Sequence, residues 1–159
     1  MSQAELHRII VGREAMGCRF EAIFNAGEVP DATELGMALL DIVDEIEARI
    51  SIYRSDTEFA RINAAAGDWV TVSADTLALI ALARDLHAQT AGGFDIAAGP
   101  LVSAWGFVKR QGRTPEPDEL AAAIAASGSR HLEVDAVASR VRLLAAGAAL
   151  NPGAIGKGW

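Results

Sequence analysis

The stretch from residue 90 to residue 107 combines glycines, aromatic side chains and one carboxylate in a way that ordinary helix or strand patterning does not explain. Its glycines permit a positive φ or a close approach of the backbone to a ligand. Asp95 stands among three large aromatic residues, Phe94, Trp105 and Phe107. A loop that presents aromatic faces and one acid suits a flat ligand with a polar rim, so the stretch predicts a binding site.

Two charged residues of the chain have more than one interpretation. Asp95 could bind a ligand, or it could only stabilise a turn through hydrogen bonds to nearby backbone groups. Lys157 lies in a second glycine-rich turn, where backbone groups and the ammonium could contact phosphate oxygens. The alternative there is an ordinary turn into a helix. It is not a Walker A loop, because Asn151 and Gly158 stand where that motif needs Gly and Ser or Thr.

The elements that would position these residues begin with a hairpin. Residues 6–11 and 18–25 are rich in apolar residues and alternate in places, which predicts two strands joined by a link that contains Gly12. A helix of about five turns follows from Asp31, which could cap it. Its expected buried face consists of Leu35, Leu39, Ile42, Ile46 and Ile50.

The remaining pattern predicts further helices and strands. Ser55 and Glu58 have the spacing of a capping box that opens a short helix through Asn63. Ser73 follows a short strand at 69–72 and caps a long helix that ends at Gly92. The buried face expected for that helix is Leu77, Ile80, Leu82, Ala83 and Leu86. An exposed connection at 109–117, a helix at 118–127 and a hairpin of 131–135 with 140–144 complete an α+β fold.

The amino-acid composition limits the kinds of partner that the chain is expected to bind. The 159 residues carry a formal net charge of −7 without a cluster of Lys or Arg, which argues against nucleic acid or an anionic membrane as a partner. Cys18 is the only cysteine, so no internal disulfide can form. No membrane span or usable signal peptide is expected, so as written the chain is predicted to be cytoplasmic, or periplasmic if a signal was removed.

Four blocks in order along the chain resemble the ApbE family, the FAD:protein FMN transferases. Met16-Gly17-Cys18-Arg19-Phe20 is similar to the family's Met-Gly-Thr-x-Phe strand, with Cys18 where Thr is usual. The next block runs from Ile52 to Glu58 and is followed by Ile62-Asn63. The most recognisable block is Thr90-Ala91-Gly92-Gly93-Phe94-Asp95, followed by Gly99-Pro100-Leu101 and Trp105-Gly106-Phe107. The last is Gly153-Ala154-Ile155-Gly156-Lys157-Gly158-Trp159.

The resemblance implies a flavin site and a reaction. Its implied FAD contacts are Met16, Tyr53, Gly93, Phe94, Asp95 and Lys157, and the backbone carbonyl of Ala154 is its implied ligand for Mg²⁺. Members of the family transfer FMN from FAD to a Thr or Ser of a partner flavoprotein and release AMP. Some instead hydrolyse FAD to FMN and AMP.

The resemblance also implies a fold: residues 1–159 form a single ApbE-like domain, an antiparallel sheet packed with helices, which corresponds to the N-terminal half of the family's fold. The family's later segments, His-x-x-Asp-Pro-x-Thr-Gly and Ala-Asp-Ala-x-x-Thr, do not occur in the sequence. We therefore expect no catalytic residue in this chain. The alternatives are a non-catalytic flavin-binding or interaction module, completed by a second chain or a homo-oligomer, and an inactive truncated fragment.

Overall fold

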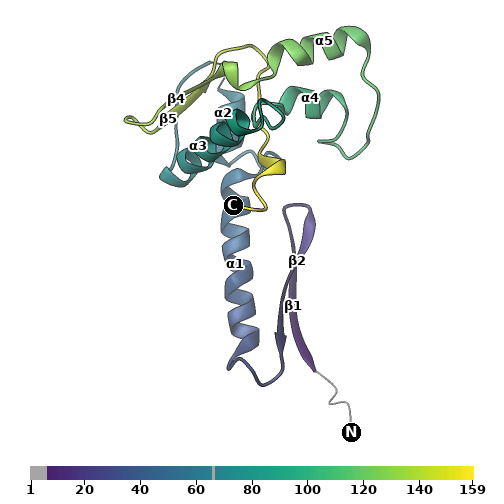
Figure 1. Ribbon diagram of the computed structural model, residues 1–159, viewed down its shortest axis with the longest axis vertical. Helices are drawn as coiled ribbons and strands as arrows, with labels where there is room; N and C mark the ends of the chain where they lie inside the picture. Colours follow the sequence, from purple (N-terminus) through teal and green to yellow (C-terminus); the bar gives the residue numbers. More distant parts are fainter. Residues whose placement is uncertain (1–6, 66) are drawn as a thin grey trace. The chain divides into compact units, whose positions relative to one another are not determined.

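The computed structural model describes residues 7–65 and 67–159 (Figure 1). The chain divides into two compact units, Met1–Ala48 and Arg49–Trp159. Both units contain helices and antiparallel strands, which confirms the α+β class. That the whole chain forms one domain stays a prediction. In the described residues, no helix has the length and apolar character needed to cross a membrane.

The first unit contains the expected hairpin. Strands β1 (Arg8–Ala15) and β2 (Cys18–Asn25) pair along their full length, from Arg8 opposite Asn25 to Ala15 opposite Cys18. The connection was predicted around Gly12, and this was wrong, because Gly12 lies inside β1 opposite Glu21. The turn is Met16-Gly17, and both residues have positive φ angles, 48° and 72°. Two positive φ angles match the right-handed twist of paired strands, so this two-residue turn closes the hairpin.

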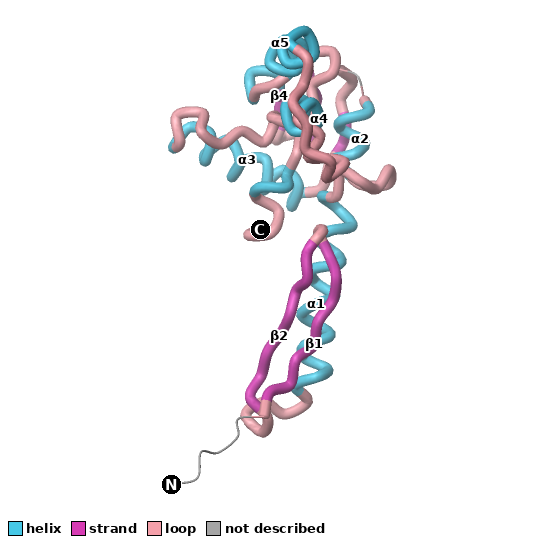
Figure 2. Tube along the Cα trace, turned by 90° about the vertical axis from the view of Figure 1, so that its right-hand side faces the viewer, coloured by secondary structure: helices cyan, strands magenta, loops and turns pink. Residues whose placement is uncertain are grey.

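Helix α1 (Ala32–Ile50) runs beside the hairpin in both views (Figures 1 and 2). Gly36 makes the close approach possible, since a Cβ there would lie 2.7 Å from Cγ2 of Val11. The helix starts after Asp31, whose φ of 53° differs from the extended backbone usual for an N-cap residue.

The face of α1 that was predicted to be buried is largely exposed. Ala32, Gly36 and Leu40 are buried instead. Gly36 and Leu40 each follow a predicted position, Leu35 and Leu39, by one residue. Leu35, Leu39 and Ile42 keep 44%, 44% and 53% of their surface exposed, and Ile46 is half-buried. Of the predicted face, only Ile50 is buried. The apolar period was therefore assigned correctly to a helix, but this stripe does not form the contact with the hairpin.

The second unit contains a three-stranded antiparallel sheet in the order β3-β5-β4. Its strands are β3 (Val70–Thr71), β4 (Leu132–Asp135) and β5 (Arg140–Leu143), each within two residues of the predicted bounds. Val141 on the central strand is fully buried and faces Val70 on one side and Val134 on the other. The core of this unit also includes Phe59, Ile62, Leu79, Ile80, Ile96 and Leu150.

Helix α2 (Glu58–Ala64) begins two residues later than the predicted capping box requires. Thr57, and not Ser55, is its N-cap, because the Thr57 hydroxyl accepts a hydrogen bond from the Ala60 N–H at 3.0 Å. The Glu58 carboxylate is directed to the next helix, where it accepts from the N–H and the hydroxyl of Ser73 at 3.0–3.1 Å. The capping box is therefore wrong in detail, and Glu58 instead links the starts of two helices.

Helices α3 (Ala74–Gln89) and α5 (Pro117–Ala126) flank the predicted binding stretch in sequence, and a third helix, α4 (Gly99–Ala104), lies inside it. Ser73 caps α3 as expected, by accepting from the Thr76 N–H at 3.2 Å. Leu82 is 39% exposed and does not belong to the buried face of α3, which includes Leu79. Helix α5 agrees closely with its prediction. Helix α4 lies within the stretch that was expected to be loop, and the short 3-10 helices Ser129–His131 and Pro152–Ala154 were also not predicted.

Candidate functional site

The loop that follows α3 is fixed by the end of that helix. The Gly92 N–H donates to the His87 carbonyl at 2.9 Å, and the Ala91 N–H donates to Ala88 at 3.2 Å. This pattern is a Schellman motif, in which the residue after the cap adopts a left-handed backbone. Here that residue is Ala91, with a φ of 50°, and Gly92 continues with a φ of 85°. Two successive left-handed residues reverse the chain after the helix, and the Gly93 N–H donates back to the Thr90 carbonyl at 3.0 Å.

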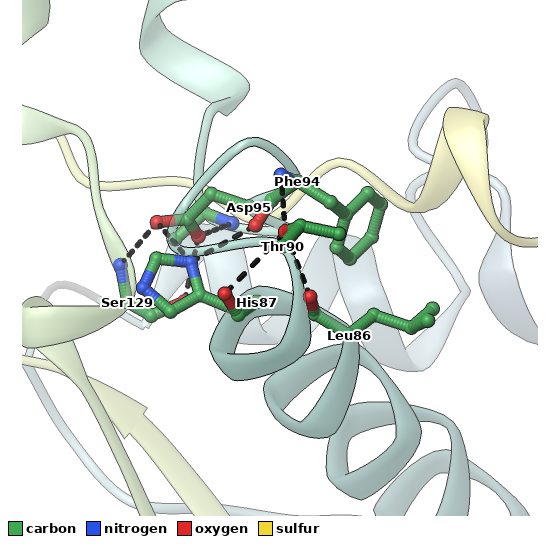
Figure 3. Close-up of polar contacts among 7 residues, drawn as sticks. Leu86, His87, Thr90, Phe94, Asp95 and Ser129 are labelled. Carbon is green, nitrogen blue, oxygen red and sulfur yellow. Dashed lines mark hydrogen bonds and ion pairs between the residues drawn. The ribbon is translucent and has the colours of Figure 1, made fainter.

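Thr90 holds the other side of this reversal (Figure 3). Its hydroxyl donates to the Leu86 carbonyl at 2.8 Å and accepts from the Phe94 N–H at 3.0 Å. The hydroxyl therefore bridges the last turn of α3 and the backbone of Phe94. A hydroxyl has one hydrogen to donate, and the Thr90 hydroxyl donates it to the helix while its oxygen accepts from the loop.

The Asp95 carboxylate joins the loop to a segment 34 residues further along the chain. Its Oδ1 accepts from the Ser129 hydroxyl at 2.6 Å and its Oδ2 accepts from the Ser129 N–H at 2.9 Å (Figure 3). Oδ1 also accepts from the Ala97 N–H at 2.8 Å, which is the Asx-turn geometry. The turn interpretation of Asp95 is therefore confirmed, and whether the carboxylate also contacts a ligand stays a prediction.

His87 is the second residue that reaches the loop from outside it. Its Nδ1 lies 2.9 Å from the Phe94 carbonyl oxygen and 3.4 Å from Oδ2 of Asp95. Since a carbonyl oxygen can only accept, Nδ1 carries the hydrogen in this contact. His87 therefore has a specific backbone partner in the loop.

The environment of Asp95 changes its acidity in two opposing ways. Partial burial raises the pKa of the carboxyl, because a desolvated charge is disfavoured. The hydrogen bonds from Ser129 and from the Ala97 N–H, together with the nearby His87, favour the charged form and outweigh the burial. The net pKa of Asp95 lies below its ordinary value, so the carboxylate is ionised at neutral pH.

The loop at residues 93–95 forms one wall of a cavity, and residues 149–154 form a second wall opposite it. The Asn151 N–H donates to the Ile96 carbonyl at 2.7 Å, and the Gly99 N–H donates to the Ala149 carbonyl at 3.2 Å. The side chain of Asn151 caps its own turn by accepting from the Gly153 N–H at 2.9 Å. These contacts place the turn at 151–154 directly beside the start of α4.

A cavity of about 480 Å³ lies between the two walls. This volume falls within the range of small-molecule sites, about 300 to 1,000 Å³. The cavity is lined by Tyr53, Gly93, Phe94, Asp95, Ala98, Val102, Asn151, Gly153 and Ala154. Its walls combine two aromatic residues with small and polar groups, which is the composition expected for a flat ligand.

The cavity brings together most of the residues predicted from the sequence. Tyr53, Gly93, Phe94, Asp95 and Ala154 all line it, although they come from three separate segments. Lys157 is exposed and is not among the lining residues. Met16 belongs to the other unit, in the turn of the hairpin. The roles of these residues in ligand binding stay predictions.

Four lining residues were not among the individually predicted contacts: Ala98, Val102, Asn151 and Gly153, of which only Asn151 lies outside the stretch at 90–107 and the sequence block that begins at Gly153. Ala98 is the N-cap of α4 and Val102 lies four residues later, so both face the same side of the helix. This helical spacing could have indicated them, but the stretch was interpreted as loop. Asn151 precedes Pro152 and Gly153, a turn-forming sequence whose Asn was noted only as a departure from the Walker A motif.

The described residues do not complete a magnesium site. Residues 7–65 and 67–159 contain no group of three or more His, Cys, Asp or Glu side chains that could hold a metal ion. Ala154 offers one carbonyl oxygen, whereas Mg²⁺ requires an octahedral set of oxygen ligands that usually includes carboxylates. The donor set in this part of the chain therefore does not fit a resident magnesium ion by itself.

Comparison with known proteins decides the family. A model of the ApbE family matches residues 16–159. The chain belongs to the ApbE family. Similar proteins include the FAD:protein FMN transferase of Vibrio cholerae, which is 32% identical over 110 residues, 67% of this chain and 33% of that protein. The recognition of the family from the four sequence blocks is thus confirmed.

Solved structures agree with the fold. The flavin transferase ApbE of Vibrio cholerae is 27% identical with a TM-score of 0.80, and the match covers 97% of this chain and 50% of that one. The ApbE protein of Thermotoga maritima, at 24% identity, has a TM-score of 0.85 and shows the same fold over 96% of this chain and 49% of its own. This ApbE chain therefore spans about a third to a half of the length of such relatives.

Proposed function

We propose that this ApbE chain carries part of the FAD site of an FAD:protein FMN transferase. The observation that carries the proposal is the cavity, which gathers Tyr53, Gly93, Phe94, Asp95 and Ala154. The relatives named as FAD:protein FMN transferases support the choice of ligand. The chain spans only part of the length of these relatives. The transferase activity of a whole protein is therefore part of the proposal, and these residues alone do not account for it.

The residues of the cavity suit different parts of FAD. Tyr53 and Phe94 offer aromatic faces against which a flavin or adenine ring can pack. Asn151 uses its oxygen within its own turn, which leaves the amide nitrogen as a hydrogen-bond donor to a polar edge of the ligand. In this proposal Met16 and Lys157 are further FAD contacts, with the Lys157 ammonium beside the pyrophosphate.

The proposed reaction is transfer of FMN to a Thr or Ser hydroxyl of a partner flavoprotein. The hydroxyl oxygen bonds to the FMN-side phosphorus and loses its proton, while the bond from that phosphorus to the bridging oxygen breaks and AMP leaves. When bound, Mg²⁺ would supply charge stabilisation at the pyrophosphate. Ala154 would contribute its backbone carbonyl to the ion, and the remaining ligands would come from other residues. With water in place of the hydroxyl, the products are FMN and AMP.

We further propose that catalysis requires a segment equivalent to the part of the relatives that this chain does not span, whichever polypeptide carries it. The apolar stripe of α1, formed by Leu35, Leu39 and Ile42, supports this, because contiguous exposed apolar surface typically marks an interface. The same segment would supply the catalytic residue and the carboxylate ligands for the metal.

A flavin titration tests this proposal. The chain is titrated into FAD while flavin fluorescence is followed, with Mg²⁺ in one series and EDTA in the other, and the products are analysed for AMP. We expect weak binding, little dependence on Mg²⁺ and no AMP. A folded chain that does not bind FAD would refute the site. Mg²⁺-dependent release of AMP would refute the need for a completing segment.

A further inference from the structure

Two side chains that do not line the cavity contact one of its walls. Gly93, Phe94 and Asp95 line the cavity, whereas His87 and Ser129 do not. Both nevertheless contact the backbone or the side chain of this wall at hydrogen-bond distance. They approach it from different elements, His87 from the last turn of α3 and Ser129 from the 3-10 helix before β4.

We propose that Ser129 and His87 are positioning residues, which hold the wall formed by Gly93, Phe94 and Asp95 in the conformation that accepts the ligand. The link to flavin affinity rests on the proposed function, but the positioning itself does not. Figure 3 shows the arrangement: Ser129 meets the Asp95 carboxylate, His87 lies beneath the loop, and the Phe94 ring points away from Ser129.

Ser129 is suited to this role because it binds both oxygens of one carboxylate. Its N–H and its hydroxyl form a fork that fixes the direction of the Asp95 side chain. The neighbouring Gly128 N–H donates to the Ala97 carbonyl at 3.1 Å, which adds a backbone bond between the same two segments. The segment at 95–97 is thereby tied to the start of β4 at several points. Removal of the hydroxyl takes away the shortest of these contacts.

His87 acts on the backbone of the wall. Its Nδ1–H binds the Phe94 carbonyl, while the Phe94 N–H is held by Thr90. Both peptide groups that flank the Phe94 side chain are therefore fixed, and the direction of the ring follows from them. The proximity of Nδ1 to Oδ2 of Asp95, at 3.4 Å, connects His87 to the contact made by Ser129.

These contacts fit a local role better than a general contribution to the core. The largest fully buried side chains, such as Phe59 and Leu79, lie elsewhere in the unit. His87 and Ser129 are both only half-buried. A loop held by side-chain hydrogen bonds at its surface opens locally at a lower free energy than the core does. Loss of these bonds should therefore loosen the wall while the unit stays folded.

The test compares two pairs of variants with a matched control. Ser129→Ala removes the hydroxyl and Ser129→Thr retains it. His87→Leu removes the donor, and His87→Asn keeps a side-chain N–H near the position of Nδ1. The control, Ser73→Ala, removes a hydroxyl that caps α3 away from the cavity. Each full-length variant is measured by amide hydrogen exchange and by titration with FAD.

We expect Ser129→Ala to speed exchange of the Ala97 amide about tenfold, since the hydrogen bond to Asp95 opens more often. His87→Leu should have a comparable effect at Phe94, and both variants should weaken FAD binding about tenfold. Ser129→Thr and His87→Asn should restore most of both properties. Ser73→Ala should speed exchange at Thr76 but leave Ala97 and FAD affinity unchanged.

The outcomes separate the two proposals. Exchange at Ala97 that is the same in Ser129→Ala as in the wild-type chain overturns the positioning role, whether or not FAD binds. Faster exchange without any binding of FAD to the wild-type chain supports the positioning role and refutes the proposed function. If the control weakens FAD binding as much as Ser129→Ala does, the effect is one of general stability and the positioning role is refuted.

Discussion

Asn63 pairs with both backbone groups of Leu150, a residue 87 positions further along the chain. The Leu150 N–H donates to Oδ1 of Asn63 at 2.7 Å, and Nδ2 of Asn63 donates to the Leu150 carbonyl at 3.0 Å. The amide side chain thus substitutes for a strand partner and connects α2 to the segment that leads into the cavity turn at 151–154. Leu150 is almost fully buried, so its backbone groups cannot turn to water.

Replacement of Asn63 by Ala is expected to destabilise the chain by about 2–4 kcal/mol, because two buried backbone groups lose their partners. Urea unfolding measures the free energy. Asn25→Ala, which removes an exposed contact with Glu28, is the control and should change stability by less than about 0.5 kcal/mol. Equal effects of the two substitutions would contradict the role assigned to Asn63.

Gly99 sits where the two walls of the cavity meet. A Cβ at this position would lie 2.5 Å from the Ala149 carbonyl oxygen, and backbone atoms cannot yield as a flexible side chain can. Gly99→Ala should therefore cost about 1–3 kcal/mol. Gly112→Ala is the matched control, since nothing lies within 4 Å of its Cβ, and it should stay within about 1 kcal/mol of the wild-type chain. A Gly99→Ala variant with unchanged unfolding free energy would argue against this close contact.

Two adjacent leucines of α1 are expected to respond very differently. Leu40 is 4% exposed and Leu39 is 44% exposed. Leu40→Ala should cost about 2–5 kcal/mol by leaving a cavity. Leu39→Ala should cost less than about 1 kcal/mol in this chain by itself. Urea unfolding of both variants decides the point, and a large loss for Leu39→Ala would mean that the stripe is covered.

Asp95 should make the stability of the chain depend on acid pH. Its pKa is lower in the folded chain than its ordinary value, so its contribution is present above the unfolded pKa of about 3.9 and disappears as pH falls through the folded pKa. Asp95→Asn should reduce the loss of unfolding free energy between pH 5 and pH 2, on which other carboxylates also act. Asp118→Asn, at the exposed start of α5, serves as the control. A pH profile that Asp95→Asn leaves unchanged would contradict this linkage.

The sequence predicted the elements better than their contacts. Hydrophobic periodicity placed α1, α3 and the strand pairs, because it reports the backbone period directly. It did not identify which stripe of α1 meets the hairpin, since the close approach at Gly36 depends on Val11 and Phe24 across the unit. The capping box failed for a similar reason, as Glu58 has a better partner in Ser73, 15 residues away.

The candidate site shows the same division. Glycine and aromatic patterning indicated Gly93 and Phe94, because a tight turn and a flat surface require those residue types. Asn151 and Ser129 were not found, since an Asn or Ser in a turn has the same sequence signal whether it lines a cavity, caps its own turn or anchors a distant loop. Only the tertiary arrangement shows that Ser129 binds Asp95 across 34 residues.

The most direct measurement of the central claim is FAD binding to a chain whose cavity is filled. Ala98 and Val102 both line the cavity from the start of α4. Val102→Trp should fill this space and weaken FAD binding at least about tenfold relative to the wild-type chain, with amide exchange in the core unchanged. Ser103→Trp, on the neighbouring exposed position, is the control and should bind FAD as the wild-type chain does. If Val102→Trp bound FAD as tightly as the wild-type chain, the cavity would not be the flavin site.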